Sequence, residues 1–400
     1  MSVRSLLSGR VVDIKGKPLP HTAVMVYHAG VKTGFSTFCP SCYRDCGKRV
    51  FTDMKGNFQI EDLDPDLWFE LLAFKNGYTA QFVERVDPDK EANVTITLVL
   101  RSENANFGGV VRGRVVDSIG SPISDAIVRS VGVIVGKASL YGSIEGLEPI
   151  AVTNRKGEFE ISYARPTPGM LLGIEARAMA PKFIAMNTGP ERHFVVLSEG
   201  ATITGRLVAN GKPVSHAEIG LIAKHMGGFA DNLSVTGDPY DEMRIGTRLD
   251  GSFTITNVPV PVNWYLYAKM DSVSNQGATN PVEVKTTSDR QYVIAKDLVL
   301  RPGYRLKGEI LLGDKKRIPD GMRVTIGSDR VWDSQTATLS GDGRFEFTNL
   351  PKGTYHISPS VKGYRMRADD QSADPSISVD HDVDGFTINL YPDSFGASPH

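Results

Sequence analysis

The feature that most constrains the fold of this chain is a set of short motifs that occurs four times in the same order. The first motif is a glycine, then a charged residue, then apolar residues, and its glycines are Gly9, Gly113, Gly205 and Gly308. The set returns at intervals of roughly one hundred residues, which is enough chain for a small domain with its own core. The sequence therefore predicts four related domains.

A turn that ends in proline follows the first motif in three of the four repeats, at residues 16–19, 120–123 and 211–214. Glycine permits unusual backbone angles and proline fixes φ, so this pair is typical of a turn. Repeat four departs from the pattern, because its proline is Pro319 and charged residues replace the glycine turn.

The third motif is Gly-x-Phe followed by alternating polar and apolar residues. Its copies begin at Gly56, Gly157, Gly251 and Gly343. Alternation with a period of two indicates a strand that is buried on one face only. The polar residue and glycine before each phenylalanine indicate a chain reversal.

Short strands separated by turns, without a convincing amphipathic helix, indicate an all-β protein. We predict four tandem β-sandwich domains in a string. Their ranges are 1–101, 106–199, 200–301 and 302–392, followed by a tail at 393–400. The joints between them are short, so neighbouring domains should pack on or restrict one another.

Taken together, the motifs Gly-Arg-Val-Val, Gly-x-Pro-Leu/Ile, Ala-x-Val, Gly-x-Phe and Leu-Pro-x-Gly-x-Tyr resemble the carboxypeptidase regulatory-like domain. The resemblance covers nearly the whole chain as four copies. It implies transthyretin-like (prealbumin-like) Greek-key β-sandwiches, which are grouped with carbohydrate-binding-like folds. Domains of this family usually accompany a peptidase, a surface receptor or a larger cell-envelope protein, and they are not the catalytic part.

The resemblance therefore implies a non-catalytic structural or binding protein, an accessory module of the bacterial cell envelope. It suggests a location in the periplasm, at the cell surface or outside the cell. A carbohydrate-binding protein is the first alternative. A fold alone does not decide between these functions.

The balance of charges argues against a nucleic-acid partner. Lys plus Arg is 45 and Asp plus Glu is 46, so no net field would steer the chain to a polyanion. No apolar run approaches the roughly 20 residues that span a bilayer. Residues 1–10 lack the apolar stretch of a signal peptide, so the chain is cytoplasmic, or its export signal was removed or never included. We expect a monomer whose partner is a protein or a polysaccharide.

The motifs of common hydrolases are absent from the sequence. It contains neither a His-Glu-x-x-His pair nor a Gly-x-Ser-x-Gly turn. We therefore expect no enzymatic activity and no cofactor, apart from a metal at the cysteine cluster described next.

Three cysteines, Cys39, Cys42 and Cys46, lie within one loop of repeat one and have no counterpart in the other repeats. Thiolates this close together could ligate a soft or borderline metal, with His28 as the fourth ligand and His21 or Asp45 as alternatives.

A disulfide between Cys39 and Cys46 is the second interpretation of the cluster, because it makes a less strained ring than the tighter pairs. A redox-active thiol is the third, since the nearby Arg44, Lys48 and Arg49 could lower a thiol pKa. The sequence leaves the three interpretations open, and a metal- or thiol-dependent protein is the second alternative function.

Aromatic residues alternate along residues 264–267, where Tyr265 and Tyr267 are separated by Leu266. One pair of this strand should face the core and the other could face solvent. Exposed tyrosine rings can stack on sugars, so Tyr265 and Tyr267 are the candidate ligand-binding residues, although cross-strand packing explains such pairs equally well.

Overall fold

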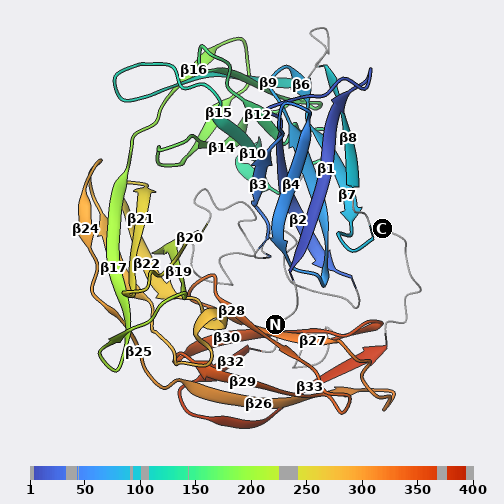
Figure 1. Cartoon of the computed structure of the whole chain (residues 1–400), viewed down its shortest axis with the longest axis vertical. Coiled ribbons are helices and arrows are strands. Elements are labelled where there is room, and N and C mark those ends of the chain that lie inside the picture. The colour runs from blue at the N-terminus through green and yellow to red at the C-terminus, as the bar shows by residue number, and fades with distance from the viewer. Residues whose placement is uncertain are drawn as a thin grey trace. The chain divides into compact units, whose positions relative to one another are not determined.

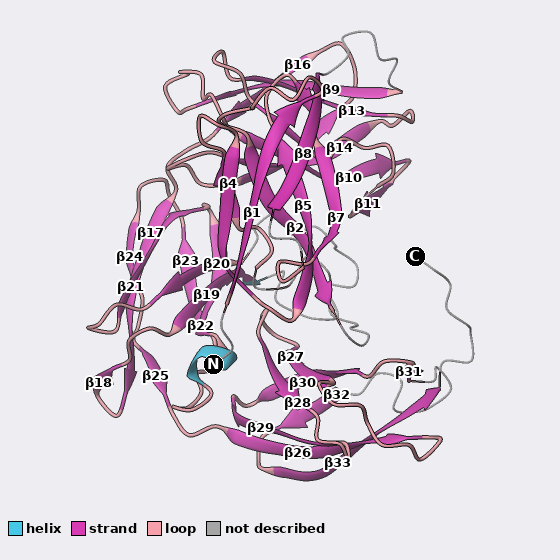
Figure 2. Cartoon of the chain, turned by 45° about the vertical axis from the view of Figure 1, so that its right-hand side comes forward, coloured by secondary structure: helices cyan, strands magenta, loops and turns pink. Residues whose placement is uncertain are grey.

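The computed structural model describes residues 4–32, 43, 45–90, 93–100, 108–142, 144–224, 242–366 and 376–392. Strands make up almost all of its regular structure, and the one helix among these residues is the short α2 (Met270–Val273) (Figures 1 and 2). The prediction of an all-β chain of tandem β-sandwiches is confirmed. No helix within the described ranges is both long and apolar enough to cross a bilayer.

The four repeats group into two compact units. The first unit contains repeats one and two and ends at Ser198, and the second begins at Glu199 and contains repeats three and four. Each unit is described by itself.

Repeats one and two form the first unit, and each folds into two sheets. Repeat one has the strand orders β4-β1-β8-β6 and β3-β2-β5-β7; repeat two has β13-β9-β16 and β11-β10-β14-β15, with β12 also on β10. The strands of repeat one are β1 (Ser5–Asp13), β2 (Ala23–Val31), β3 (Arg49–Phe51), β4 (Asn57–Leu63), β5 (Leu67–Phe74), β6 (Tyr78–Thr79), β7 (Gln81–Val86) and β8 (Asn93–Leu100). Those of repeat two are β9 (Gly109–Val116), β10 (Ile127–Val135), β11 (Ala138–Tyr141), β12 (Ile150–Val152), β13 (Glu158–Tyr163), β14 (Gly169–Glu175), β15 (Lys182–Asn187) and β16 (Arg192–Val196).

Repeats three and four form the second unit with the same plan. In repeat three, β17 pairs with β18, β21, β24 and β25, and the other sheet is β20-β19-β22-β23; in repeat four the orders are β29-β26-β33-β31 and β28-β27-β30-β32. The strands of repeat three are β17 (Ala201–Ala209), β18 (Lys212–Pro213), β19 (Glu218–Ala223), β20 (Met243–Gly246), β21 (Ser252–Val258), β22 (Val262–Ala268), β23 (Val282–Thr286), β24 (Tyr292–Ile294) and β25 (Leu298–Leu300). Those of repeat four are β26 (Tyr304–Leu312), β27 (Arg323–Ser328), β28 (Ser334–Thr338), β29 (Arg344–Leu350), β30 (Gly353–Ser360), β31 (Tyr364–Arg365), β32 (Ser376–Val379) and β33 (Val383–Pro392).

The first strand of each repeat lies in the middle of its sheet. It runs antiparallel to the strand of the Gly-x-Phe motif and parallel to the last strand of the repeat. Two parallel neighbours need a long crossover between them. In each repeat the strands between the first and the last form this crossover. The first and last strands of the repeat therefore lie side by side.

The first and third motifs meet across this antiparallel pair. Gly9 is opposite Phe58, Gly113 opposite Phe159, Gly205 opposite Phe253 and Gly308 opposite Phe345. In every pair the phenylalanine ring covers the glycine, and a Cβ on Gly113 would lie 2.3 Å from the ring of Phe159. The glycine is needed because any side chain there would collide with the ring.

The glycine of the third motif also has a common role. Gly56, Gly157, Gly251 and Gly343 have φ between 72° and 85°. The carbonyl oxygen of each accepts a hydrogen bond from the first strand, as in the 2.8 Å bond from the Val115 N–H to Gly157. The left-handed backbone favours glycine because other residues are strained there.

The proline turn closes onto the same first-strand residue in repeats one to three. The Ile123 N–H, for example, donates to the Val115 carbonyl oxygen at 3.0 Å. In repeat four the corresponding N–H of Ile318 donates to Gly341 instead. Repeat four, which lacks the glycine of the proline turn, therefore also lacks, among its described residues, this hydrogen bond from the turn to the first strand.

A core lies between the two sheets of every repeat, and each of the four cores draws on one repeat, with one exception. Met270, at the start of α2 in repeat three, is buried in the core of repeat four. In the first unit a smaller apolar cluster joins the repeats, since Leu72 and Phe74 of β5 are buried with Ile127 and Ile150 of repeat two. Within each unit the repeats are thus packed pairs.

Candidate functional site

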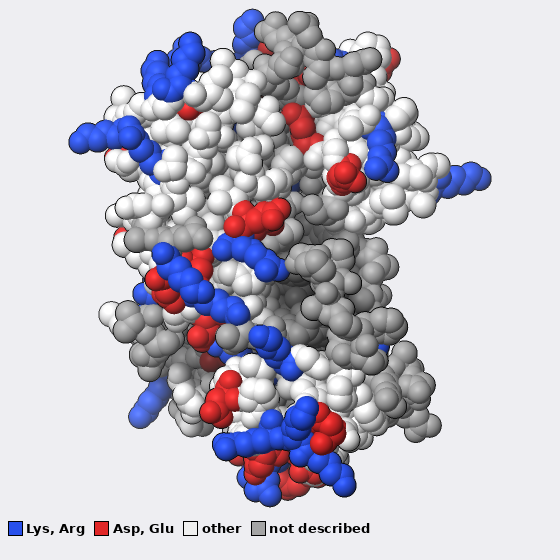
Figure 3. Space-filling model, turned by 90° about the vertical axis from the view of Figure 1, so that its right-hand side faces the viewer, with Lys and Arg blue, Asp and Glu red and all other residues white. Residues whose placement is uncertain are grey.

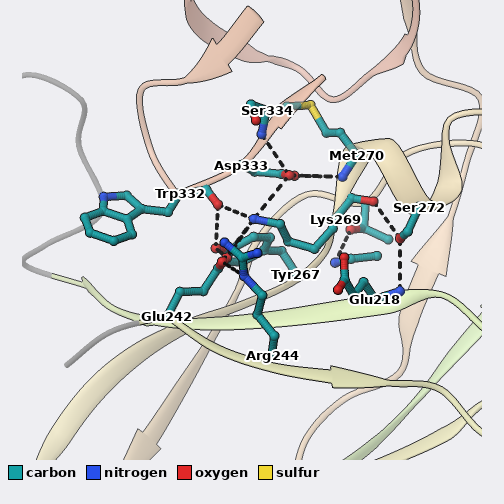
Figure 4. Close-up of polar contacts among 12 residues, drawn as sticks. Glu218, Glu242, Arg244, Tyr267, Lys269, Met270, Ser272, Trp332, Asp333 and Ser334 are labelled. Carbon is teal, nitrogen blue, oxygen red and sulfur yellow. Dashed lines mark hydrogen bonds and ion pairs between the residues drawn. The ribbon is translucent and has the colours of Figure 1, made fainter. Parts of the chain in front are cut away.

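The most unusual polar site in the described residues lies inside the second unit, between repeats three and four. Charged side chains gather there around the end of β22 and the loop that leads into β28 (Figure 4). Repeat three contributes Glu242, Arg244, Tyr267 and Lys269, and repeat four contributes Trp332 and Asp333. We call these six residues the junction cluster.

Alternation along β22 directs side chains to both sides of its sheet. Trp264 and Leu266 enter the core of repeat three. Tyr265 and Tyr267 lie on the opposite face and are buried with Val331 of repeat four. The expectation that this second pair faces solvent as a sugar-stacking surface is therefore wrong, because only 8% of Tyr265 and 1% of Tyr267 is exposed. A neighbouring repeat covers the face that sequence alone would leave open.

The carboxylate of Glu242 is the centre of the cluster. Its two oxygens lie 2.9 and 3.1 Å from Nζ of Lys269, and it also pairs with Nε of Arg244. The Tyr267 hydroxyl donates to the same carboxylate. Burial, followed by the charge of Glu242, raises the pKa of Tyr267 well above its ordinary value, so this phenol stays protonated and donates.

Asp333 faces Lys269 from the other repeat. Its Oδ1 lies 3.7 Å from Nζ of Lys269, and both residues are more than nine-tenths buried. The backbone N–H groups of Met270 and Ser334 donate to the Asp333 carboxyl at 3.0 to 3.1 Å. Burial nevertheless raises the pKa of Asp333 to about 7, against the opposing effect of Lys269.

The side chains of Lys269, Glu242 and Asp333 are thus enclosed together, whereas Arg244 reaches the carboxylate from the partly exposed strand β20. Removing such groups from water costs free energy that is recovered only with good geometry and enough hydrogen bonds. The cluster meets that requirement by taking partners from both repeats, since Nζ of Lys269 also donates to the carbonyl oxygen of Trp332. It can therefore fix one arrangement of repeat three on repeat four within the unit.

The cysteine cluster lies largely beyond the residues that the structure describes, because Cys39 and Cys42 fall outside the described ranges. Cys46 is half-buried and packs against the core of repeat one. Among the described residues no group of three or more His, Cys, Asp and Glu side chains is placed to hold a metal. The metal, disulfide and redox interpretations of the three cysteines stay predictions.

Two of the predicted partners of that cluster are engaged elsewhere in repeat one. Nδ1 of His28 lies 2.7 Å from the Glu70 carboxylate. Asp45 is buried and pairs with Lys48 at 2.8 Å and with Arg4 at 3.4 Å. Asp45 therefore has a structural role in holding the end of the loop.

The sequence alone does not reveal the junction cluster. Glu242, Lys269 and Asp333 come from separate segments and match no spacing motif. The one local signal is a lysine directly after the apolar strand β22, where a charge would be expected at a solvent-exposed end. The structure buries it instead, because the loop before β28 closes over it.

Comparisons with known proteins give only distant structural similarity. No protein-family model and no curated protein matches the chain. The Bacillus anthracis TIE protein is similar at 9% identity and a TM-score of 0.20, over 97% of this chain and 74% of that one. The Streptococcal ancillary pilin has 13% identity and a TM-score of 0.23, over 72% of this chain and 100% of that one.

BcpA, the major pilin subunit of Bacillus cereus, has 12% identity and a TM-score of 0.19, over 75% of this chain and 100% of that one. TM-scores of this size carry no argument about fold or function. The all-β class rests here on the strands and cores described above.

Proposed function

We propose that this chain is a non-catalytic structural and binding module of the carboxypeptidase regulatory-like type. It acts outside the cytoplasm as an accessory part of a cell-envelope assembly, where its paired repeats hold binding surfaces in a constant arrangement. The support from sequence is the fourfold motif set, and the support from structure is the junction cluster.

The observation that carries the proposal is the enclosure of the junction cluster between two consecutive repeats. Charged groups at an enzyme site must remain open to a substrate, whereas Lys269 and Asp333 are closed off by neighbouring protein atoms. Their hydrogen bonds connect one repeat to the next. Buried charges that connect two domains are more typical of a stiff spacer than of a catalytic site.

The face of the molecule drawn in Figure 3 is in keeping with a protein or polysaccharide partner. Figure 3 shows Lys and Arg side chains interspersed with Asp and Glu on the face in view, without a large area of one sign. A nucleic-acid partner would favour a continuous basic stripe. The carbohydrate-binding alternative loses its candidate residues, because Tyr265 and Tyr267 are buried.

A distance measurement between spin labels tests the stiffness of the second unit. Labels at the exposed positions Leu249 in repeat three and Leu311 in repeat four, attached through non-natural ketone residues, leave the native cysteines untouched. We expect one narrow distance distribution, which broadens in Asp333→Ala. A broad distribution in the otherwise unchanged protein would contradict the proposal, as would peptide or ester turnover that a single substitution abolishes.

A further inference from the structure

We propose that Lys269 and Asp333 condense to form an amide between Nζ and Cγ, which links repeat three covalently to repeat four. The geometry points to this modification because the amine and the carboxyl already face each other, with 3.7 Å between Nζ and Oδ1. Figure 4 shows the Lys269 side chain directed toward Trp332, Asp333 and Glu242. Both reacting groups are held on backbone that the junction fixes, so the reaction is intramolecular and favoured by proximity.

Condensation needs a neutral carboxylic acid, since a carboxylate resists attack by an amine. Burial favours this form, because it raises the pKa of Asp333 to about 7. Transfer of one proton from Nζ of Lys269 to the Asp333 carboxylate gives the neutral amine and the neutral acid that the condensation needs. The same enclosure keeps out the water that would hydrolyse the product.

Backbone donors lie where the reaction would develop negative charge. Oδ1 of Asp333 accepts hydrogen bonds from the N–H groups of Met270 at 3.1 Å and Ser334 at 3.0 Å. When Nζ attacks Cγ, one carboxyl oxygen becomes an oxyanion, and preorganised N–H donors stabilise it. The loop before β28 and the start of α2 thus both position the acid.

Glu242 is the proton carrier. Its carboxylate lies 2.9 Å from Nζ of Lys269, and the Tyr267 hydroxyl and Arg244 orient it. It takes a proton from Nζ as the N–C bond forms and returns it to the second oxygen of Asp333 as that C–O bond breaks. One water leaves, no atom changes oxidation state and no co-reactant is needed.

The mass of the intact, denatured full chain tests the proposal. We expect the purified protein to weigh one water less than its sequence, after allowance for N-terminal processing. Protease digestion should give a branched peptide that joins the segments around Lys269 and Asp333. Lys269→Arg and Glu242→Gln should both have the full sequence mass, and Asp333→Asn should lose one ammonia in place of one water.

A full sequence mass for the unaltered protein would overturn the proposal and leave the pair as an ion pair. A water loss that maps to another position, such as a cyclised aspartate, would also overturn it, and so would a water loss that persists in Lys269→Arg. The readout is independent of the proposed function, because a flexible or catalytic protein could carry the same amide.

Discussion

The ring of Phe253 occupies the space that a side chain on Gly205 would need. These two residues are opposite one another on β21 and β17, and a Cβ on Gly205 would lie 2.5 Å from Cζ of the phenylalanine. The contact explains why the two most regular motifs of the sequence recur together. The glycine of the first motif has no side chain, and the phenylalanine ring of the third motif fills the space that is left.

Gly205→Ala should therefore destabilise repeat three by about 1 to 3 kcal/mol, since the added methyl group forces the buried ring to move. The matched control is Gly246→Ala in the same repeat, where a Cβ would meet nothing within 4 Å. Urea unfolding monitored by hydrogen exchange at β17 and β21 measures the difference. Equal stability of the two variants would show that the ring has room to adapt.

Phe159→Ala should cost repeat two about 3 to 5 kcal/mol, because it removes a buried ring from the core and leaves the adjacent Gly113 uncovered. Phe194→Ala is the control in the same repeat, since that side chain is 68% exposed. Chemical denaturation of both variants provides the measurement. A loss below about 1 kcal/mol for Phe159→Ala would mean that the strand pairing is wrong.

Thr153 is expected to be a stabilising residue that its sequence context does not reveal. Its hydroxyl accepts the Ala126 N–H at 2.8 Å and donates to the Ile123 carbonyl oxygen at 2.7 Å. Thr153→Val keeps the shape but removes the partner of the buried Ala126 N–H and of the part-buried Ile123 carbonyl oxygen, so it should cost about 1 to 3 kcal/mol.

Thr153→Ser keeps the hydroxyl and is the control for that substitution. It should retain most of the stability and the slow exchange of the Ala126 amide proton. Thr52 and Thr247 accept the equivalent N–H bonds in repeats one and three, so the same pair of substitutions can be repeated there.

Acid should destabilise repeat one through Asp87. Burial alone would raise the pKa of this carboxyl. Hydrogen bonds from Lys32 and from the Asp89 backbone N–H lower the pKa by more than burial raises it, so the net pKa is below the ordinary value. A lowered pKa in the folded state contributes stability that is present above the unfolded pKa of about 4 and is lost as the pH falls through the folded pKa.

Asp87→Asn should therefore flatten the acid limb of the stability curve of repeat one below about pH 4. Thermal unfolding at a series of pH values measures this limb. If stability falls with pH as steeply in Asp87→Asn as in the unaltered protein, Asp87 is not the cause of the acid destabilisation.

The three cysteines should matter more to the shape of their loop than to global stability. Crosslinks between residues so close in sequence close only short rings and gain little entropy. Replacement of Cys39, Cys42 and Cys46 by serine should therefore shift the melting temperature by a few degrees only. Intact mass under non-reducing conditions, with and without chelator, separates a disulfide from a bound metal, and failure of the variant to fold would indicate a structural metal site.

Much of the fold follows from local pattern. Alternation along residues 58–60 and 345–347 predicts strands with one buried face, and the structure buries Phe58, Ile60, Phe345 and Phe347. The turn glycines are equally local, because a positive φ is a property of one residue and its neighbours. Spacing along the chain could not show that Gly205 and Phe253 would touch, since the register of two strands decides that contact.

The sequence by itself determined four sandwich repeats, their turns and the inward faces of their strands, because these depend on periodicity and on the backbone preferences of glycine and proline. Only the tertiary structure decided that Tyr265 and Tyr267 are buried and that Lys269 meets Glu242 and Asp333. A strand has two faces, and its sequence cannot say whether a neighbouring repeat will cover the outer one. Once repeat four covers that face of β22, charges from distant segments are removed from water together, and their pairing follows from that enclosure.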